Sequence, residues 1–203
     1  TVNISPATNG TESYSYSIIS GNDNSYFSIS GTTITVKSNT PANTSGYKIT
    51  VRATDTNSKV TRGMLVTMLH NMENKPYVAG TSKFSDVKNT KEYYYVAVKW
   101  AAKNNIVSGY SNGKFGANDP VTREQLAVIL NQYCKYKGKY KSITANLASF
   151  KDSNKISSYA KWGMNWAVGN KIINGSNGKL NPQGTATRAE AAAMLSNYCK
   201  SIK

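Results

Sequence analysis

The pattern of hydrophobic and polar residues changes near residue 60. Over residues 1–59, apolar and polar positions alternate in short segments such as "YSYSII", "TTITVKS" and "YKITVRATD", and this period of two predicts strands with one buried face. Turn-forming clusters such as "SGNDNS" and "TPANTSG" separate those segments. We therefore expect residues 1–59 to form a small all-β sandwich.

From residue 60 onward the apolar residues recur with the period of 3.6 that is typical of helices, and the pattern repeats. Each copy consists of a predicted helix, a glycine-rich loop and a second predicted helix, and the copies span residues 77–140 and 141–203. The matching positions are Phe84 and Phe150, Asp86 and Asp152, Trp100 and Trp166, Thr122 and Thr187, Arg123 and Arg188, and Cys134 and Cys199. This region is therefore expected to be all-α.

A third copy of the second helix, with no first half in front of it, lies between the two regions. The segment "VTRGMLVTMLHNMENKP" (60–76) places Leu65, Met68 and Leu69 at the same spacings from a threonine as in the other copies. This spacing predicts the last helix of a truncated repeat. Two alternatives stay open: residues 60–70 also alternate as a last strand of the β-region would, or part of the repeat is missing from the chain near Lys59.

The second helix of each longer copy begins at a threonine. Thr122 with Gln125, and Thr187 with Glu190, have the spacing of a capping box. In that motif the threonine oxygen accepts a bond from a first-turn amide, and the residue three positions later reaches back to the cap. These pairs predict helices that start directly after the two threonines.

An arginine follows each of these threonines. Three of the chain's four arginines, Arg62, Arg123 and Arg188, stand in this position, although the positive end of the helix dipole disfavours a cation there by about 0.3 to 1 kcal/mol. Free backbone amides and a guanidinium group together suit a carboxylate or a phosphate. The alternative is that each arginine pairs with an acid of a neighbouring unit, such as Asp86 or Asp152.

Several of these motifs recur in a fixed order that resembles a known family. The copies share an F-x-D opening, an aromatic first helix, a "GxxNG(K)(F/L)" loop and a T-R-(A/E)-(E/Q) helix start, and in these features residues 60–203 are similar to S-layer homology repeats. The resemblance implies a pseudo-threefold, three-pronged helical spindle, with the first repeat incomplete here. It also implies non-covalent attachment to secondary cell wall polymers of Gram-positive bacteria, with pyruvylated sugars bound in grooves between neighbouring repeats.

The same resemblance nominates ligand-binding residues. In members of the family with this activity, the arginine of the T-R motif meets the anionic group; loop glycines would permit close approach of the backbone, and a tryptophan is able to stack on a sugar. The corresponding residues here are Arg62, Arg123, Arg188, Gly109, Gly113, Gly175, Gly178, Trp100 and Trp166. Two simpler interpretations stay open, because the tryptophans lie near apolar stripes and suit a core, and the glycines suit turns.

The β-region carries a resemblance of its own. The segment "YKITVRATD" (47–55) is similar to a strand that often ends bacterial cadherin-like and immunoglobulin-like modules. Calcium-binding members of that family hold the ion with clustered carboxylates, whereas Asp55 is the only acid in this motif. We therefore expect no metal site here.

Composition narrows the range of partners. The chain carries 25 lysines and arginines against 10 acidic residues, a formal net charge of +15, so an anionic partner is expected. The lysines are scattered, and zinc-finger spacing, an aromatic RNP stretch and a basic helix are absent, so nucleic acid is not expected.

No apolar run reaches membrane length, which argues against membrane insertion. The opening "TVNISPATNGTES" has no signal-peptide pattern and looks like a mature chain or an excised fragment.

Neither catalysis nor a bound cofactor is expected. The single histidine, His70, falls on the helix predicted after Thr61, where a solvated position is the simpler interpretation, and no nucleophile and base can be assembled around it. Cys134 and Cys199 occupy equivalent helix positions and are expected as buried thiols, with a disulfide as the alternative.

These patterns predict a non-catalytic, extracellular module that anchors a surface protein to an anionic cell wall glycan. The alternative is a structural subunit that self-associates into a surface layer or a filament. Glycan affinity of a monomer favours the first function, and concentration-dependent assembly without glycan favours the second.

Overall fold

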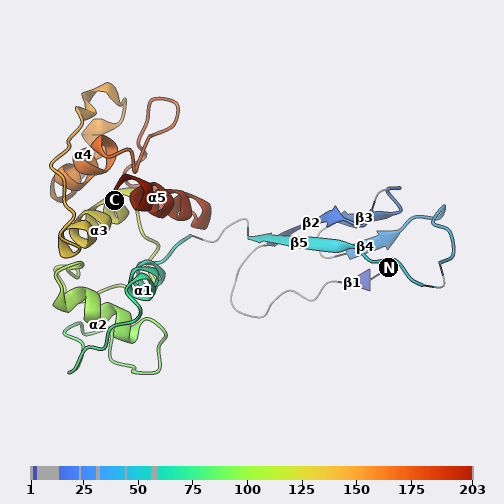
Figure 1. Ribbon diagram of the computed structural model, residues 1–203, viewed down its shortest axis with the longest axis horizontal. Coiled ribbons are helices and arrows are strands. Elements are labelled where there is room, and N and C mark those ends of the chain that lie inside the picture. Colours follow the sequence, from blue (N-terminus) through green and yellow to red (C-terminus); the bar gives the residue numbers. More distant parts are fainter. Residues whose placement is uncertain are drawn as a thin grey trace. The chain divides into compact units, whose positions relative to one another are not determined.

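Two compact units make up the chain. The computed structural model describes residues 2–3, 14–22, 24–30, 33–43, 45–55 and 59–202, and the chain divides into the units Thr1–Ser58 and Lys59–Lys203. Figure 1 shows strands in the first unit and helices in the second. The change of hydrophobic period near residue 60 therefore coincides with the division between the units.

The described residues of the first unit contain five short strands in two antiparallel sheets. Strands β1 (Val2–Asn3), β4 (Thr33–Val36) and β3 (Phe27–Ser30) form one sheet in that order, and β2 (Tyr14–Ser20) pairs with β5 (Thr50–Asp55) in the other. The predicted β-structure is confirmed. Among the residues of this unit whose exposure is described, Ile34 is the only buried hydrophobic one. The shared core that a sandwich needs is therefore not seen among these residues.

The second unit contains five α-helices within residues 59–202. They are α1 (Arg62–Met72), α2 (Tyr95–Lys103), α3 (Arg123–Tyr136), α4 (Lys161–Gly169) and α5 (Arg188–Ser201). Three short 3-10 helices precede α4, namely η1 (Leu147–Ser149), η2 (Ser153–Lys155) and η3 (Ser158–Ala160). Helix α1 packs on α2 and α3 packs on α4, and Figure 1 shows α2 and α4 at opposite ends of the unit. The all-α prediction for this region is confirmed.

Residues 62–72 form a helix, so the alternative of a last β-strand is wrong. The side chain of Thr61 accepts a hydrogen bond from the amide of Met64 at 3.2 Å and caps the helix. Leu65 and Leu69, one helical turn apart, are completely buried. A helix buries both leucines on one stripe together with Val66, which explains why the alternation in this segment does not decide its structure.

The same stripe buries His70, for which a solvated position was expected. Only 5% of its surface is exposed, its Nε2 atom lies 3.0 Å from the carbonyl oxygen of Pro76, and its ring centroid lies 5.3 Å from that of Trp100. The expectation was wrong because His70 follows Leu69 at the edge of the buried face of α1 and packs against α2.

Both tryptophans of the first helices belong to the hydrophobic core. Trp100 on α2 and Trp166 on α4 have 1% and 0% of their surface exposed, and they share one continuous cluster of buried residues in the helical unit. A sugar cannot stack on rings that are covered on all sides. The prediction that these two tryptophans contact a ligand is therefore wrong, and burial of their large apolar surface explains their position in each repeat.

The two cysteines are free thiols in different environments. Cys134 is buried and Cys199 is exposed, so the disulfide alternative does not hold and the expectation of equivalent core positions is wrong for Cys199. Cys134 belongs to the hydrophobic core and lies beside Tyr198 of α5. Cys199 instead lies in the last turn of α5, near the end of the chain.

Three backbone hydrogen bonds connect the starts of the second helices in a closed triangle. Val60, Val121 and Ala186 each precede a capping threonine. The amide of Val60 donates to Ala186 at 3.0 Å, the amide of Ala186 donates to Val121 at 2.9 Å, and the amide of Val121 donates to Val60 at 2.8 Å. Residues 60–62 therefore take a place equivalent to the corresponding residues of the two longer copies.

Candidate ligand-binding grooves

Threonine caps open α1, α3 and α5 with the same geometry. The side chains of Thr61, Thr122 and Thr187 each accept a hydrogen bond from the amide three residues later, at 3.2 Å. In α3 and α5 the side chains of Gln125 and Glu190 also accept from the threonine amides. Both predicted capping boxes are therefore confirmed.

A loop of the next repeat occupies the first amides of α1. The amide of Arg62 donates to the carbonyl of Asp119 at 3.0 Å, and the amide of Gly63 donates to the carbonyl of Ala117 at 2.8 Å. The loop before α3 thus supplies the acceptors that a helix N-terminus otherwise lacks.

Helix α3 docks in the same way on the loop before α5. The amide of Arg123 donates to the carbonyl of Gly184 at 2.9 Å, and the amide of Glu124 donates to the carbonyl of Pro182 at 2.9 Å. The expectation that free amides at these helix starts bind an anion is therefore wrong for α1 and α3. The arginine side chains are the remaining candidates for contact with an anion at these helix starts.

The Arg62 side chain is buried between two aromatic rings. Its Nε donates to the carbonyl of Phe115 at 2.9 Å, and its Nη2 donates to the carbonyl of Ser108 at 3.4 Å. The Cζ atom lies 4.7 Å from the ring centroids of both Tyr110 and Phe115, within the range of cation–π attraction. Only 5% of the residue is exposed, and this burial lowers the pKa of Arg62.

No carboxylate in the described part of the chain lies within 4.0 Å of Arg62. The guanidinium lines a pocket with a volume of about 590 Å³. The pocket walls come from the loop after α2, from one face of α3 and from the segment before α4. They include Ser108, Gly109, Tyr110, Gln125, Gln132 and Tyr159.

A buried carboxylate on α3, that of Glu124, positions Tyr159 in this pocket. Glu124 is 3% exposed, and it accepts hydrogen bonds from the amide and hydroxyl of Ser157 at 3.0 and 2.7 Å. The hydroxyl of Tyr159 donates to Glu124 at 3.1 Å. Burial, followed by the charge of Glu124, raises the pKa of Tyr159 to about 12. The phenol is therefore neutral at ordinary pH.

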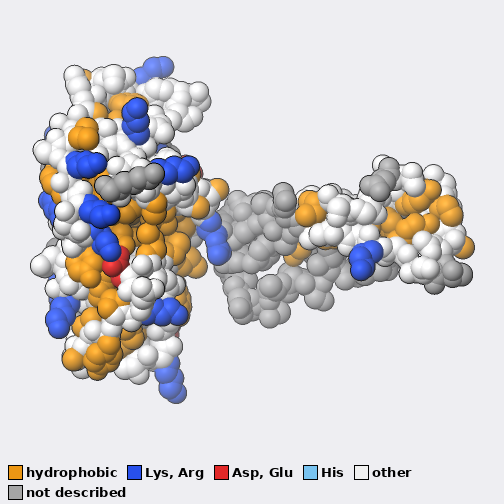
Figure 2. Space-filling model, viewed as in Figure 1, with side chains coloured by type: hydrophobic (Ala, Val, Ile, Leu, Met, Phe, Trp, Pro, Cys, Tyr) orange, Lys and Arg blue, Asp and Glu red, His pale blue; other side chains and the backbone are white. Residues whose placement is uncertain are grey.

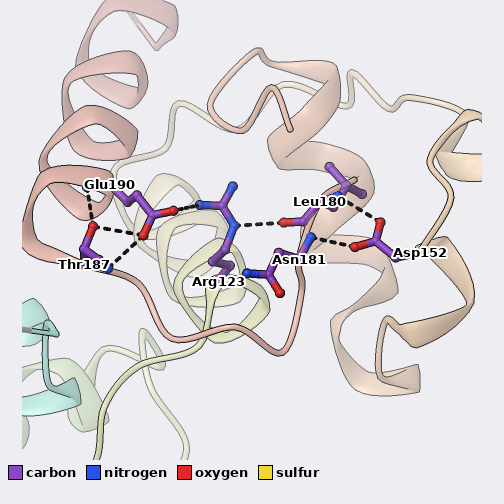
Figure 3. Close-up of polar contacts among 6 residues, drawn as sticks. All are labelled: Arg123, Asp152, Leu180, Asn181, Thr187 and Glu190. Carbon is purple, nitrogen blue, oxygen red and sulfur yellow. Dashed lines mark hydrogen bonds and ion pairs between the residues drawn. The ribbon is translucent and has the colours of Figure 1, made fainter. Parts of the chain in front are cut away.

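Arg123 makes the same loop contact as Arg62 but carries a different partner. Its Nε donates to the carbonyl of Leu180 at 2.8 Å, as Arg62 does to Phe115, and its Nη1 lies 3.0 Å from Oε1 of Glu190. Figure 3 shows the guanidinium held between this carboxylate and the loop carbonyl. The pocket beside Arg123 has a volume of about 1210 Å³ and is lined mainly by the loop before α5, with Lys151, Asp152 and Lys155 beside it.

The aspartates of the F-x-D motif hold the loops rather than the arginines. Asp86 accepts from the amides of Phe115 and Gly116 at 2.7 and 2.8 Å. Asp152 accepts from the amides of Leu180 and Asn181 at 2.9 and 2.8 Å (Figure 3). The alternative that each arginine pairs with an acid of a neighbouring unit is therefore confirmed for Arg123, whose partner is Glu190, whereas neither aspartate forms an ion pair with Arg62 or Arg123. Partial burial alone would raise the pKa of both aspartates, but the amide donors hold each pKa below its ordinary value.

The four predicted glycines divide between the pockets and the turns beside them. Gly109 lines the Arg62 pocket and Gly175 lines the Arg123 pocket. A Cβ atom at Gly109 would lie 2.6 Å from the ring of Phe84, so close packing excludes a side chain there. Gly113 and Gly178 have positive φ angles of 76° and 72° and do not appear among the lining residues of these pockets.

Arg188 lies at an open position. It is exposed, and it lines a pocket of about 410 Å³ together with residues of α1, α5 and the segment before α2. The other lining residues are Val60, Met64, Thr67, Met68, Tyr93 and Ala192. This pocket is lined mostly by apolar side chains, whereas the Arg62 pocket combines apolar residues with the amides and hydroxyls named above.

Sequence reasoning missed three contributors to these sites. Tyr110, Tyr159 and Glu124 were not among the predicted residues, although each packs close to an arginine or shapes its pocket. The repeat offset carried one signal, since Tyr93 and Tyr159 match in the same way as Trp100 and Trp166.

Figure 2 shows lysine and arginine side chains spread over the visible face of the helical unit, with little acidic surface among them. Among the described residues, no helix has the length and hydrophobicity needed to cross a membrane. The same residues contain no cluster of three or more histidine, cysteine, aspartate or glutamate side chains placed to hold a metal ion.

Comparison with known proteins gives the family of the helical unit. Residues 83–127 and 149–192 match the S-layer homology domain. The chain is 36% identical over 138 residues to an exoglucanase, XynX, of Acetivibrio thermocellus. This alignment covers 67% of this chain and 12% of the relative. It is 34% identical over 141 residues to an amylopullulanase of Thermoanaerobacterium thermosulfurigenes, covering 68% of this chain and 7% of the relative.

A surface-layer protein is also similar. The 125 kDa surface-layer protein of Lysinibacillus sphaericus is 32% identical over 127 residues, covering 61% of this chain and 10% of the relative. The chain thus spans only a small part of each relative. S-layer homology domains are non-catalytic modules of S-layer and cell-surface proteins, and the predicted location at the cell surface is confirmed. The helical unit of this chain carries two copies of the S-layer homology domain, a module that anchors surface proteins to the cell wall.

Proposed function

We propose that the helical unit anchors its parent protein to the wall of a Gram-positive bacterium by binding an anionic secondary cell wall polymer whose sugars carry pyruvate. One observation carries this proposal. Arg62 is a buried cation with no described carboxylate within 4.0 Å, since Asp119 and Asp86 attract it from a longer distance, and it lines a pocket of about 590 Å³. This proposed role is non-catalytic.

Electrostatics explains why this pocket favours an anion. Removing a cation from water costs several kcal/mol unless an opposite charge or hydrogen bonds replace the lost solvation. The Nε and Nη2 atoms of Arg62 donate to loop carbonyls, and a guanidinium has five N–H donors in all. The remaining donors suit the carboxylate of a pyruvate ketal, which would supply the missing negative charge.

The other groups in the pocket suit a sugar. Gln125, Gln132 and Tyr159 offer amide and hydroxyl groups for sugar hydroxyls, and the ring of Tyr110 stands beside the guanidinium. The net charge of +15 would in addition attract an anionic polymer over a longer range, although salt would screen this effect.

The three-pronged spindle is part of the same proposal. The closed triangle of hydrogen bonds among Val60, Val121 and Ala186 supports it, as does the identical docking of α1 and α3 on the loop of the next repeat. In such a spindle each groove lies between neighbouring repeats, which is where Arg62 and Arg123 contact their loops.

Self-association into a surface layer or filament is the second candidate function. The apolar side chains of Met64 and Met68 beside Arg188, together with the half-exposed Tyr93, favour it. A contact between copies of the chain would cover such a surface.

Co-sedimentation with purified wall sacculi tests the two functions. We expect the chain to sediment with sacculi, to lose binding after extraction of the secondary polymer, and to bind about tenfold more weakly as Arg62→Lys, which keeps the charge but loses the planar fork. Binding that survives both changes would contradict the proposal. Sedimentation that rises with protein concentration in the absence of sacculi would favour self-association.

A further inference from the structure

The grooves beside the three arginines follow one plan, but only one of them contains every part of it. The parts are the arginine after a threonine cap, the loop of the next repeat, one face of that repeat's second helix, and a tyrosine located two residues before a first helix. Tyr93 precedes α2 and Tyr159 precedes α4 in this way.

The Arg62 groove contains all of these parts. The loop after α2 provides Ser108, Gly109 and Tyr110, and Tyr159 comes from the repeat beyond. The face of α3 provides residues three, six, seven and ten positions after its cap, which are Gln125, Val128, Ile129 and Gln132.

The Arg123 groove lacks one part. It has the loop before α5 and Glu190 from the start of that helix. Among its described lining residues there is no tyrosine corresponding to Tyr159. If the three repeats are arranged in a ring, that tyrosine would come from the first half of the truncated repeat, just before its first helix.

The Arg188 groove lacks a different part of that same repeat. Met64, Thr67 and Met68 of α1 stand three, six and seven positions after their cap, as the lining residues of α3 do, and Tyr93 matches Tyr159. No loop corresponding to residues 108–115 lines this groove in the described part of the chain. The two incomplete grooves therefore each lack a contribution from the first half of the truncated repeat.

One position also sets the charge of each groove. Three residues after the cap, the helix that borders Arg62 has Gln125, the helix that borders Arg123 has Glu190, and the helix that borders Arg188 has Met64. Glu190 forms an ion pair with Arg123 at 3.0 Å. A neutral amide at the corresponding place leaves the charge of Arg62 available to a ligand.

We infer that the Arg62 groove is the single complete site for the pyruvylated sugar in residues 59–202, and that Gln125 keeps this site open to a carboxylate. This inference rests on the function proposed above. A carboxylate at position 125 would occupy the guanidinium as Glu190 occupies Arg123, and a ligand carboxylate would then have to displace it. Gln125 is therefore the residue that sets the preference of the groove for an anion.

Calorimetric titration of the whole chain with a methyl hexopyranoside carrying a pyruvate ketal tests this inference. The variant Gln125→Glu keeps the capping box, since Glu190 forms the same box in α5, so a loss of binding cannot be assigned to a lost cap. The variant Gln125→Met removes the amide without adding charge and copies Met64. Glu190→Gln is the matched change in the Arg123 groove, and a thermal melt of each variant checks its folding.

We expect one molecule of the probe per chain, at least tenfold weaker binding by Gln125→Glu than by Gln125→Met, and less than a twofold change for Glu190→Gln. Two or more equal sites, or wild-type affinity in Gln125→Glu, would overturn the inference and leave the proposed function standing. Failure of the wild-type chain to bind the probe would overturn the proposed function and this inference with it.

Discussion

Arg62 and Arg123 occupy the same backbone frame, but only Arg123 forms a direct ion pair with a described carboxylate. Each follows a threonine cap, and each donates its Nε to a carbonyl in the loop of the next repeat, at 2.9 and 2.8 Å. Arg123 then meets the carboxylate of Glu190, whereas Arg62 meets two aromatic rings and no described carboxylate. The frame is therefore repeated, while the chemistry of each groove is set separately.

The repeated motif has a structural role in both copies. The docked amides hold each loop against the preceding second helix, and the aspartates of the F-x-D motif hold the same loop against the start of its own repeat. This explains why an arginine is tolerated at a helix start, because loop carbonyls offset the unfavourable interaction with the helix dipole. In the function proposed above, ligand recognition depends in addition on residues that differ between the copies.

The largest change in the comparison is expected from removing the close packing of the loops. A Cβ atom at Gly109 would lie 2.6 Å from the Phe84 ring, and one at Gly175 would lie 2.8 Å from the carbonyl of Lys179. Overpacking of this kind costs about 1 to 3 kcal/mol. Gly175→Ala should cost about 1 to 2 kcal/mol more, because its φ angle is 69°.

Urea unfolding of the two alanine variants measures these costs. Gly113→Ala is the control, since its Cβ atom would meet no atom within 4 Å and only its positive φ angle is strained. If Gly109→Ala were as stable as the wild type, the loop would not be packed against Phe84 as described.

The aspartates should give the next largest effect, and an equal one in the two copies. Asp86→Asn and Asp152→Asn each weaken two charge-assisted hydrogen bonds to loop amides, which we expect to cost about 1 to 3 kcal/mol of unfolding free energy. Chemical denaturation at neutral pH measures this loss. A large effect at one aspartate alone would contradict the equivalence of the two frames.

The pH dependence of stability follows from the same contacts. Amide donors hold the pKa of both folded aspartates below the ordinary value of 3.8. Their contribution is therefore fully present above that value and is lost as the pH falls through the lower, folded pKa. We expect the wild type to lose stability below about pH 4, and the double variant Asp86→Asn, Asp152→Asn to show a shallower loss over that range.

The smallest effect is expected at the ion pair that distinguishes the grooves. Glu190→Gln keeps a side chain that is able to form the capping box and removes the charge paired with Arg123, so the cost should be about 0.2 to 1 kcal/mol. Added salt should reduce the difference between this variant and the wild type, because ions screen the pair. Thermal melts at low and high salt measure this difference. A cost that does not change with salt would point to a lost hydrogen bond in place of the charge.

The sequence predicted the local parts of this frame well. The repeat offset located the helices, and the spacing of Thr122 and Gln125 predicted a capping box that the structure confirms. These features depend on residues within one helical turn of each other, and a local pattern is sufficient to specify them.

Long-range contacts explain what the sequence did not reveal. The amide of Arg123 looked free because its acceptor, Gly184, lies 61 positions further along the chain. The apolar stripe of α1 gave no sign that it extends to His70, which is buried by packing against Trp100. The tryptophans suited both a core and a sugar-binding surface, and only tertiary packing distinguishes these two roles.

The most direct test of the account is to observe the arginine side chains during binding. Nuclear magnetic resonance of the Nε–H groups of Arg62, Arg123 and Arg188, recorded while the pyruvate-ketal sugar is added, reports on each groove separately. We expect a saturable shift of the Arg62 signal at one equivalent of sugar, with the other two signals nearly unchanged. A saturable shift of the Arg123 or Arg188 signal at the same sugar concentration, or a silent Arg62, would contradict this expectation.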